Sequence, residues 1–158
     1  MRMIIIIAGC RNFNNYEFFK RKCDKLLSVI KTKCEITIIS GGALGVDTMA
    51  EKYSIENNYN FKEYPADWRS YPRNAGIIRN CEMGTIADRL IAFWDQKSSG
   101  TRHMISEAKR KGLKIKVVNI WILKFITIKQ IIFYIPYIPE LSIYVGKLIV
   151  EIGRNIEK

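Results

Sequence analysis

The sequence predicts a doubly wound α/β domain, in which helices cover both faces of a mainly parallel sheet. Short apolar segments rich in β-branched residues alternate with segments whose apolar residues recur at helical spacing. Continuously apolar strands are typical of parallel sheets, because such strands are buried on both faces. The alternation of strands and helices favours right-handed crossovers, which place successive strands side by side in one sheet.

The expected elements follow one another through short turns. The first strand covers residues 3–8, a run rich in isoleucine that ends at Gly9. Further strands are expected at 36–39, 61–64, 90–94 and 115–120, and helices at 16–31, 46–57, 73–83 and 101–111. Pro65 marks the end of the third strand, and Gly112 ends the last helix, because proline cannot donate to a strand ladder and glycine favours a helix C-terminus.

Composition limits the classes of protein that fit the chain. Its 158 residues, 48% of them hydrophobic, suit one domain with one core. The formal net charge of +11 favours anionic partners, although lysine-rich helices that only keep the protein soluble would give the same charge. The four cysteines form no C-x-x-C pair and there is one histidine, so we expect no zinc site. A chain of this size can fold on its core alone, so we expect no disulfide framework. We therefore expect no metal, no cofactor and reduced thiols in a cytoplasmic protein, and the run at 3–8 is too short for a secretory signal.

We expect the chain to divide into a nucleotide-binding domain at residues 1–120 and an apolar extension at 121–158. The extension is rich in isoleucine and tyrosine, and Pro136 and Pro139 interrupt it. Lys124 and Lys129 leave it short of the roughly 20 apolar residues that a membrane-spanning helix needs. Packing on the domain is favoured, with a subunit contact or a membrane-surface segment as the alternatives.

Three glycine-containing turns follow the first, second and fourth predicted strands. In an open parallel sheet, ligands bind beyond the carboxyl ends of the strands. Glycines let a ligand approach the backbone, and the free N–H groups at the start of a helix attract anions. The candidate residues in these turns are Gly9 and Arg11; Ser40, Gly41, Gly42, Ala43, Gly45 and Asp47; and Ser99, Gly100 and Thr101. Ordinary capped connectors are the alternative for each turn taken alone.

Several polar and aromatic side chains are expected to contact the ligand in addition to the glycine-containing turns. Asp47 would repel an adjacent phosphate, so we expect it to cap the helix or to accept a ribose hydroxyl. Arg79 and Met83 lie four residues apart on one helix face, and Asn80 lies beside them. Trp68 and Tyr71 are expected to stack on a base. In the alternative, Trp68 and Met83 belong to the core and Arg79 is solvated.

One further side chain, His103, lies in a predicted helix without an obvious partner. We expect it to be a surface histidine that takes no part in the site.

At these residues the chain resembles the SLOG superfamily, and within it the YspA-like branch. The resemblance covers residues 3–118. It implies a Rossmann-like fold that binds nucleotides or nucleotide derivatives, as a homo-oligomer with a sensing or ligand-processing role. The segments that carry it are Gly9-Cys10-Arg11-Asn12-Phe13, Ser40-Gly41-Gly42-Ala43-Leu44-Gly45-Val46-Asp47, Pro65-Ala66-Asp67-Trp68, Ala75-Gly76-Ile77-Ile78-Arg79-Asn80-Cys81-Glu82-Met83 and Gly100-Thr101.

Another branch of this superfamily, the LOG phosphoribohydrolases, releases the base from a nucleoside monophosphate. In that branch a glutamate follows a glycine-rich stretch, and Met104 stands at the matching position here. A thioether cannot perform general acid–base catalysis. A hydrolase would therefore need its carboxylate from Asp47, Glu82 or Glu107, with Arg79 matching the family arginine.

The segments 40–47 and 72–74 are also similar to the DprA/SMF proteins, relatives that bind single-stranded DNA. Three functions stay open. Binding or sensing of a nucleotide-like small molecule is favoured, N-glycosidic hydrolysis of a nucleotide is second, and binding of single-stranded nucleic acid is third.

Overall fold

The structure is a computed structural model that describes residues 1–120, and the expected extension at 121–158 lies outside the described residues. The strands are β1 (Arg2–Gly9), β2 (Glu35–Ser40), β3 (Asn60–Glu63), β4 (Arg89–Trp94) and β5 (Lys114–Asn119). The helices are α1 (Tyr16–Leu27), α2 (Val46–Glu56), α3 (Ala75–Ile86) and α4 (Ser99–Arg110). The order of strands and helices along the chain matches the sequence prediction.

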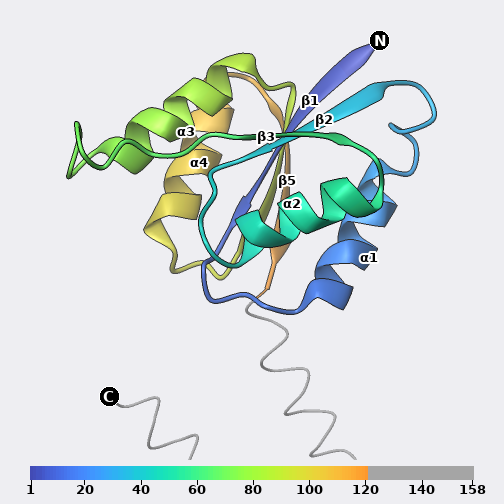
Figure 1. Ribbon diagram of the computed structural model, residues 1–158, viewed down its shortest axis with the longest axis horizontal. Coiled ribbons are helices and arrows are strands. Elements are labelled where there is room, and N and C mark those ends of the chain that lie inside the picture. Colours follow the sequence, from blue (N-terminus) through green and yellow to red (C-terminus); the bar gives the residue numbers. More distant parts are fainter. Residues whose placement is uncertain (121–158) are drawn as a thin grey trace, which may run out of the picture. The chain divides into compact units, whose positions relative to one another are not determined.

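The five strands form one parallel sheet in the order β3-β2-β1-β4-β5 (Figure 1). The central strand β1 pairs with β2 on one side, where Ile5 lies opposite Ile38, and with β4 on the other, where Ile6 lies opposite Leu90. The chain therefore winds outward in both directions from β1, which confirms the doubly wound, Rossmann-like fold. Ligands of such sheets bind where the strand order reverses, here beyond the carboxyl ends of β1 and β4.

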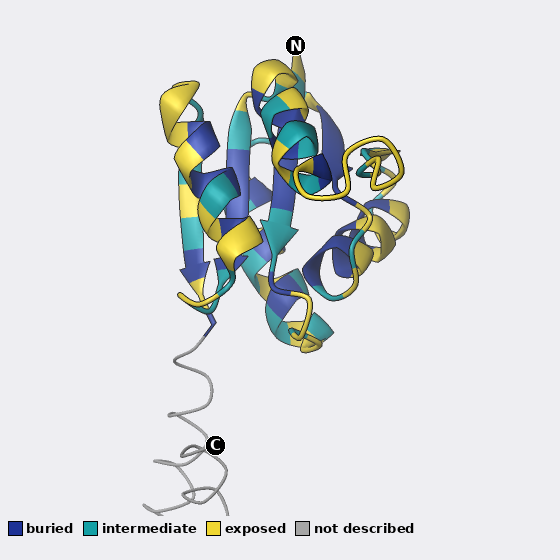
Figure 2. Cartoon of the chain, turned by 90° about the vertical axis from the view of Figure 1, so that its left-hand side faces the viewer, coloured by how far each residue is buried: buried dark blue, intermediate teal, exposed yellow. Residues whose placement is uncertain are grey.

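Each face of the sheet is covered by one pair of helices. Ile5 and Ile7 of β1 pack in a cluster with Phe19 of α1 and Tyr53 of α2. Ile6 points to the opposite face and packs in a second cluster, to which α3 and α4 contribute. The three inner strands β1, β2 and β4 are buried at their centres, whereas the edge strands β3 and β5 are more exposed, and each helix exposes one side (Figure 2). Within residues 1–120, no helix combines the length and apolar character needed to cross a membrane.

The largest differences from the predicted boundaries concern two helices. α1 ends at Leu27, four residues before the predicted end, and turns occupy the following residues. α3 continues to Ile86, three residues beyond the predicted end, and passes through Gly84. A Cβ atom at Gly84 would lie 3.1 Å from Cγ of Glu107 on α4, so the glycine allows the two helices to pack closely. That packing offsets the low helix propensity of glycine.

Candidate functional site

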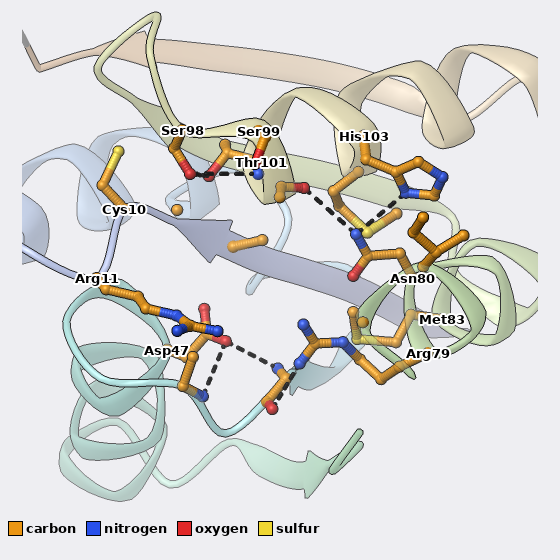
Figure 3. A pocket seen from close by; sticks show the side chains of 18 of the residues that line it. Cys10, Arg11, Asp47, Arg79, Asn80, Met83, Ser98, Ser99, Thr101 and His103 are labelled. Carbon is orange, nitrogen blue, oxygen red and sulfur yellow. Dashed lines mark hydrogen bonds between the residues drawn. The ribbon is translucent and has the colours of Figure 1, made fainter. Parts of the chain in front are cut away.

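A cavity of about 890 Å³ lies at the carboxyl ends of β1, β2 and β4, where the strand order reverses (Figure 3). Gly9 lines it from the end of β1, Arg11 from the turn that follows, and Gly41 from the turn after β2. The opposite side is lined by Asp95 and Ser98 of the turn after β4 and by Ser99 and Thr101 of the first turn of α4. The structure thus confirms that the three predicted turns meet at one cavity.

Most of the predicted ligand-binding residues line this cavity. They are Gly9, Arg11, Gly41, Ala43, Asp47, Trp68, Arg79, Asn80, Met83, Ser99, Gly100 and Thr101. Ser40, Gly42 and Gly45 are not among the lining residues. Ser40 is fully buried in β2, Gly42 faces the Glu63 carboxylate, and Gly45 packs against the backbone of residues 10–11. These three residues shape the turn behind the cavity.

The glycine-rich turn after β2 is closed by the chain's own carboxylate. Asp47 Oδ2 accepts hydrogen bonds from the backbone N–H groups of Gly41 and Ala43, each at 3.2 Å. One of our two expectations for Asp47 was that it caps α2. The cap position is instead Gly45, and Asp47 stabilises the turn that precedes the helix. The other carboxylate oxygen points toward the cavity (Figure 3). Two N–H groups that the sequence offered to a ligand are therefore already occupied.

Asp47 is only 6% exposed, and two arginines act on its charge. Burial raises its pKa to about 6, although the hydrogen bond from Ala43 and the charges of Arg79 and Arg11 oppose this shift. Burial also lowers the pKa of Arg79, and the Asp47 carboxylate counteracts that effect. The cavity therefore combines two cationic side chains with one carboxyl group that titrates near neutral pH.

Arg79 connects α3 to the glycine-rich turn. Its Nη1 donates a 2.6 Å hydrogen bond to the carbonyl oxygen of Gly41. Its Nε is buried and has no hydrogen-bond partner among the described residues. A Cβ atom at position 41 would overlap the guanidinium, so Gly41 is needed for Arg79 to reach this place.

The first turn of α4 forms the opposite wall. Ser98 caps the helix and accepts from the N–H of Thr101, and the two hydroxyl oxygens lie 3.0 Å apart. Asn80 Nδ2 donates to the Gly100 carbonyl oxygen at 3.3 Å and lies 3.3 Å from His103 Nδ1 (Figure 3). The Asn80 amide nitrogen can only donate, so a hydrogen bond between these two atoms requires the His103 tautomer whose Nδ1 accepts.

The expectation that His103 is a partnerless surface residue is wrong. It is half-buried, contacts Asn80 and lines the cavity. Its position four residues after Ser99 was the available signal, because residues four apart share a helix face. Arg73 and Ile77 also line the cavity and were not predicted, although Ile77 lies three residues before Asn80 on the same face of α3.

The remaining lining residues that the sequence analysis did not assign to the site are Ala8, Cys10, Asn12, Gly76, Asp95, Lys97, Ser98 and Met104. Asp95 begins the turn after β4, and its Oδ1 accepts from the N–H groups of Lys97 at 2.9 Å and Ser98 at 2.7 Å. Burial raises the pKa of Asp95, but these hydrogen bonds outweigh burial and hold the pKa below its usual range. Asp95 thus shapes its turn as a stable carboxylate.

Of the three carboxylates considered for catalysis, the structure brings only Asp47 to the cavity. Glu82 is exposed on α3 and does not line it. Glu107 is buried away from the lining and forms two hydrogen bonds to Arg110, at 2.6 and 2.9 Å. Within residues 1–120, no group of three or more His, Cys, Asp or Glu side chains could hold a metal ion.

An Asp47→Asn variant is expected to gain stability over the parent protein as pH rises from 4 to 8. Burial raises the pKa from 3.8 to about 6, so the folded protein binds this proton more tightly than the unfolded chain. The resulting stabilisation is complete below about pH 4 and is lost as pH rises through about 6, a change on the order of 3 kcal/mol. Urea unfolding of both proteins at several pH values measures this difference.

The control for that experiment is Asp67→Asn. Asp67 is exposed, and the hydrogen bonds from Ser70 lower its pKa, so its replacement should give no such gain. Parallel pH profiles for the parent protein and Asp47→Asn would contradict the assignment of a raised pKa to Asp47.

Comparison with known proteins agrees with this fold. Residues 3–71 match the family described as "YspA, cpYpsA-related SLOG family". The gene 61 protein of Mycobacterium phage D29 is 33% identical over 86 residues, which cover 51% of this chain and 69% of the phage protein.

Two solved structures are also similar. DNA processing protein A (DprA) from Streptococcus pneumoniae matches with a TM-score of 0.57 and 15% identity over 73% of this chain. The DprA of Helicobacter pylori, studied for its single-stranded DNA binding mode, matches with a TM-score of 0.51 and 20% identity over 73% of this chain. The chain spans 50% and 64% of these two DprA chains, and the likeness shows a shared fold.

Proposed function

The chain belongs to the YspA, cpYpsA-related SLOG family, and from this premise we propose that its cavity binds a nucleotide or a nucleotide-derived small molecule. One observation carries the proposal. The turns after β1, β2 and β4 meet at a single cavity that also receives the guanidinium groups of Arg11 and Arg79. A cavity of about 890 Å³ lies within the range of roughly 300–1,000 Å³ that is usual for small-molecule sites.

The phosphate of the ligand belongs at the α4 side of the cavity. The N–H groups of Gly41 and Ala43 already donate to Asp47, so the turn after β2 has fewer free donors than its glycines suggest. The N-terminus of α4 offers backbone N–H groups and a positive helix end, and Thr101 lines the cavity there. Arg11 and Arg79 supply charge-assisted hydrogen bonds from the other side.

The sugar and the base then lie against Asp47 and Trp68. The cavity-facing oxygen of Asp47 can accept a hydrogen bond from a ribose hydroxyl, which also keeps the carboxylate away from the phosphate. Trp68 lines the cavity, and a Cβ atom at Gly76 would lie 3.7 Å from its ring, so the indole rests on the start of α3. Its ring provides an apolar surface for a base.

Calorimetric titration of the full chain with AMP, GMP, CMP, UMP and ADP tests this proposal. We expect saturable binding of at least one of them, weakened about tenfold or more by Arg11→Ala, because a hydrogen bond between charged groups contributes about 1.5–3 kcal/mol. Arg102→Ala is the control, since Arg102 is exposed on α4 outside the cavity lining. Absence of saturable binding by the whole panel, with the protein shown to be folded, would overturn the proposal.

A second candidate function is hydrolysis of the N-glycosidic bond of a nucleoside monophosphate. It is favoured by Asp47, a carboxyl group of the cavity whose pKa, raised by burial to about 6, suits a general base near neutral pH. In this reaction water attacks the anomeric carbon while Asp47 takes one of its protons. The electrons of the broken C–N bond leave with the base, and the proton that Asp47 accepted is returned, through solvent, to that base.

Incubation of the protein with AMP or CMP, followed by chromatography for free base, decides between binding and hydrolysis. If the protein is a hydrolase, Asp47→Asn should slow base release by about 100-fold or more, while Glu82→Gln should release base at the parent rate. A folded parent protein that releases no base eliminates this candidate and leaves nucleotide binding unaffected.

A further inference from the structure

The solvent-facing side of α1 carries basic residues. Phe19, Cys23 and Leu27 are buried at four-residue spacing and pack this helix against the sheet. Arg21 and Lys25 lie two residues out of step with that spacing, about 200° around the helix axis, and both are exposed. α1 therefore presents positive charge on the side that faces away from the core.

The turns that follow α1 continue this basic surface. Lys31 and Lys33 are exposed in the segment that leads from α1 into β2 (Figure 1). Their N–H groups donate hydrogen bonds of 3.0 Å to the carbonyl oxygens of Leu27 and Ile30, which hold the two residues in successive turns. We call the four exposed cations of this surface the basic corner: Arg21, Lys25, Lys31 and Lys33.

The basic corner has no carboxylate partners of its own. Within residues 1–120, none of its four side chains takes part in a salt bridge. The two carboxylates in the same stretch of chain bind other groups. Asp24 accepts a 2.8 Å hydrogen bond from the hydroxyl of Tyr53, and Glu35 accepts one of 2.8 Å from Nδ2 of Asn60. The four cations are therefore available to an anionic partner.

Two exposed aliphatic side chains lie at the same end of the domain. Val29, four residues after Lys25, is 66% exposed, and Ile55, in the last turn of α2, is 70% exposed. α1 and α2 cover the same face of the sheet, and each leads into a parallel strand. Their C-terminal ends therefore lie at the edge where the strands begin. This edge combines positive charge with apolar side chains in contact with solvent.

This combination fits an anionic lipid surface better than a nucleic acid. Lipid phosphates attract basic residues, and apolar side chains insert at the boundary between headgroups and acyl chains. A nucleic acid would use the same cations but would give Val29 no apolar surroundings.

The basic corner also lacks exposed aromatic rings, on which the bases of a single strand would stack. Phe18 of α1 is half-buried, and the cations of Arg21 and Lys22 lie 5.7 and 5.1 Å from its ring centroid. The large exposed aromatic side chains of residues 1–120 lie between β3 and α3, where Trp68 lines the cavity and Tyr71 does not. The partner that matches both features of the corner is therefore a lipid surface.

We propose that the basic corner docks the domain onto an anionic membrane surface, with its cations against lipid phosphates and with Val29 and Ile55 among the headgroups. The turns after α1 lie at the edge where the strands begin, whereas the cavity lies at the carboxyl ends of the strands. Docking therefore does not cover the cavity, and this inference is independent of the proposed function.

Cosedimentation of the full chain with phosphatidylcholine vesicles, with and without about 30% phosphatidylglycerol, tests the proposal. We expect binding to the anionic vesicles at least about tenfold tighter than to the neutral ones, and weaker at high salt. The triple variant Lys25→Gln, Lys31→Gln, Lys33→Gln should bind the anionic vesicles at least about 30-fold more weakly than the parent. Each basic residue near an anionic surface contributes roughly fivefold, so three of them exceed this limit.

The matched control is the triple variant Arg69→Gln, Arg102→Gln, Lys116→Gln. It removes the same charge from exposed positions outside the basic corner and the cavity lining, so it should bind within about threefold of the parent. Absence of binding to the anionic vesicles, or equal binding by the two triple variants, overturns the inference. Equal binding would show that another part of the chain attaches the protein to lipid.

Val29 separates a lipid surface from other polyanions. Val29→Ser should weaken vesicle binding about threefold or more because the apolar side chain is lost, and Val29→Leu should bind at least as tightly as the parent. The turn itself is held by the backbone of Val29, whose carbonyl oxygen accepts from the Thr32 hydroxyl at 2.9 Å, so both variants should fold. Vesicle binding that is unchanged by Val29→Ser overturns the inference. Loss of binding to a short DNA duplex by the Lys25, Lys31 and Lys33 variant would then identify a nucleic-acid surface instead.

Discussion

A Gly45→Ala variant should lose about 3 kcal/mol or more of unfolding free energy. Gly45 has φ +80°, a conformation that residues with a Cβ atom rarely adopt, and such strain costs about 1–3 kcal/mol. In addition, an alanine Cβ would lie 2.5 Å from the carbonyl oxygens of both Cys10 and Arg11. These are backbone atoms of the β1–α1 turn, which cannot rotate aside as a side chain could, so overpacking adds about 1–3 kcal/mol.

Two other glycines separate the causes of this loss. Gly112 also has a positive φ of +72°, but a Cβ there would meet nothing within 4 Å, so Gly112→Ala measures strain alone and should cost about 1–2 kcal/mol. Gly100 lacks both features and lies in α4, so Gly100→Ala should cost nothing or stabilise slightly. Urea unfolding of the three variants gives the order. A loss at Gly45 no greater than that at Gly112 would contradict the packing argument.

The sequence predicted the centre of the sheet well because its three inner strands, β1, β2 and β4, are buried on both faces. A run such as residues 3–8, apolar at every position, is compatible with the centre of a parallel sheet, and β1 occupies that place. The position of the site followed from the same topology, since the turns after β1, β2 and β4 must emerge at one edge. The expected homo-oligomer, cytoplasmic location and extension at 121–158 concern other copies or other residues, and they stay predictions.

Which groups of the site remain free for a ligand could not be read from the sequence. The glycines at 41–45 suggested free N–H groups. In the structure, however, the N–H groups of Gly41 and Ala43 donate hydrogen bonds to the Asp47 carboxylate. Arg79 was predicted to reach into the cleft, yet its bond to the Gly41 carbonyl depends on a contact between residues 38 positions apart. Partners of this kind are set by tertiary packing, which hydrophobic periodicity does not encode.

Arg79→Ala should weaken the binding of AMP by about 10- to 100-fold. The variant removes a charge-assisted hydrogen bond to the phosphate, whose contribution is about 1.5–3 kcal/mol. It also removes one of the two positive charges that act on the Asp47 carboxylate. Calorimetric titration of AMP measures the loss, and Arg102→Ala, which removes an exposed charge outside the cavity lining, should change the affinity less than twofold.

Gly41→Ala tests whether Arg79 acts from its observed position. The new Cβ would overlap the guanidinium, which lies at the end of a flexible side chain, so the arginine would swing away and lose its bond to the Gly41 carbonyl. We therefore expect Gly41→Ala to weaken AMP binding nearly as much as Arg79→Ala, with little effect on folding. Because both changes remove the same contact, the double variant should bind AMP no more weakly than Arg79→Ala alone. Additive losses would show that Gly41 contributes by another route, such as direct approach of the ligand to the backbone.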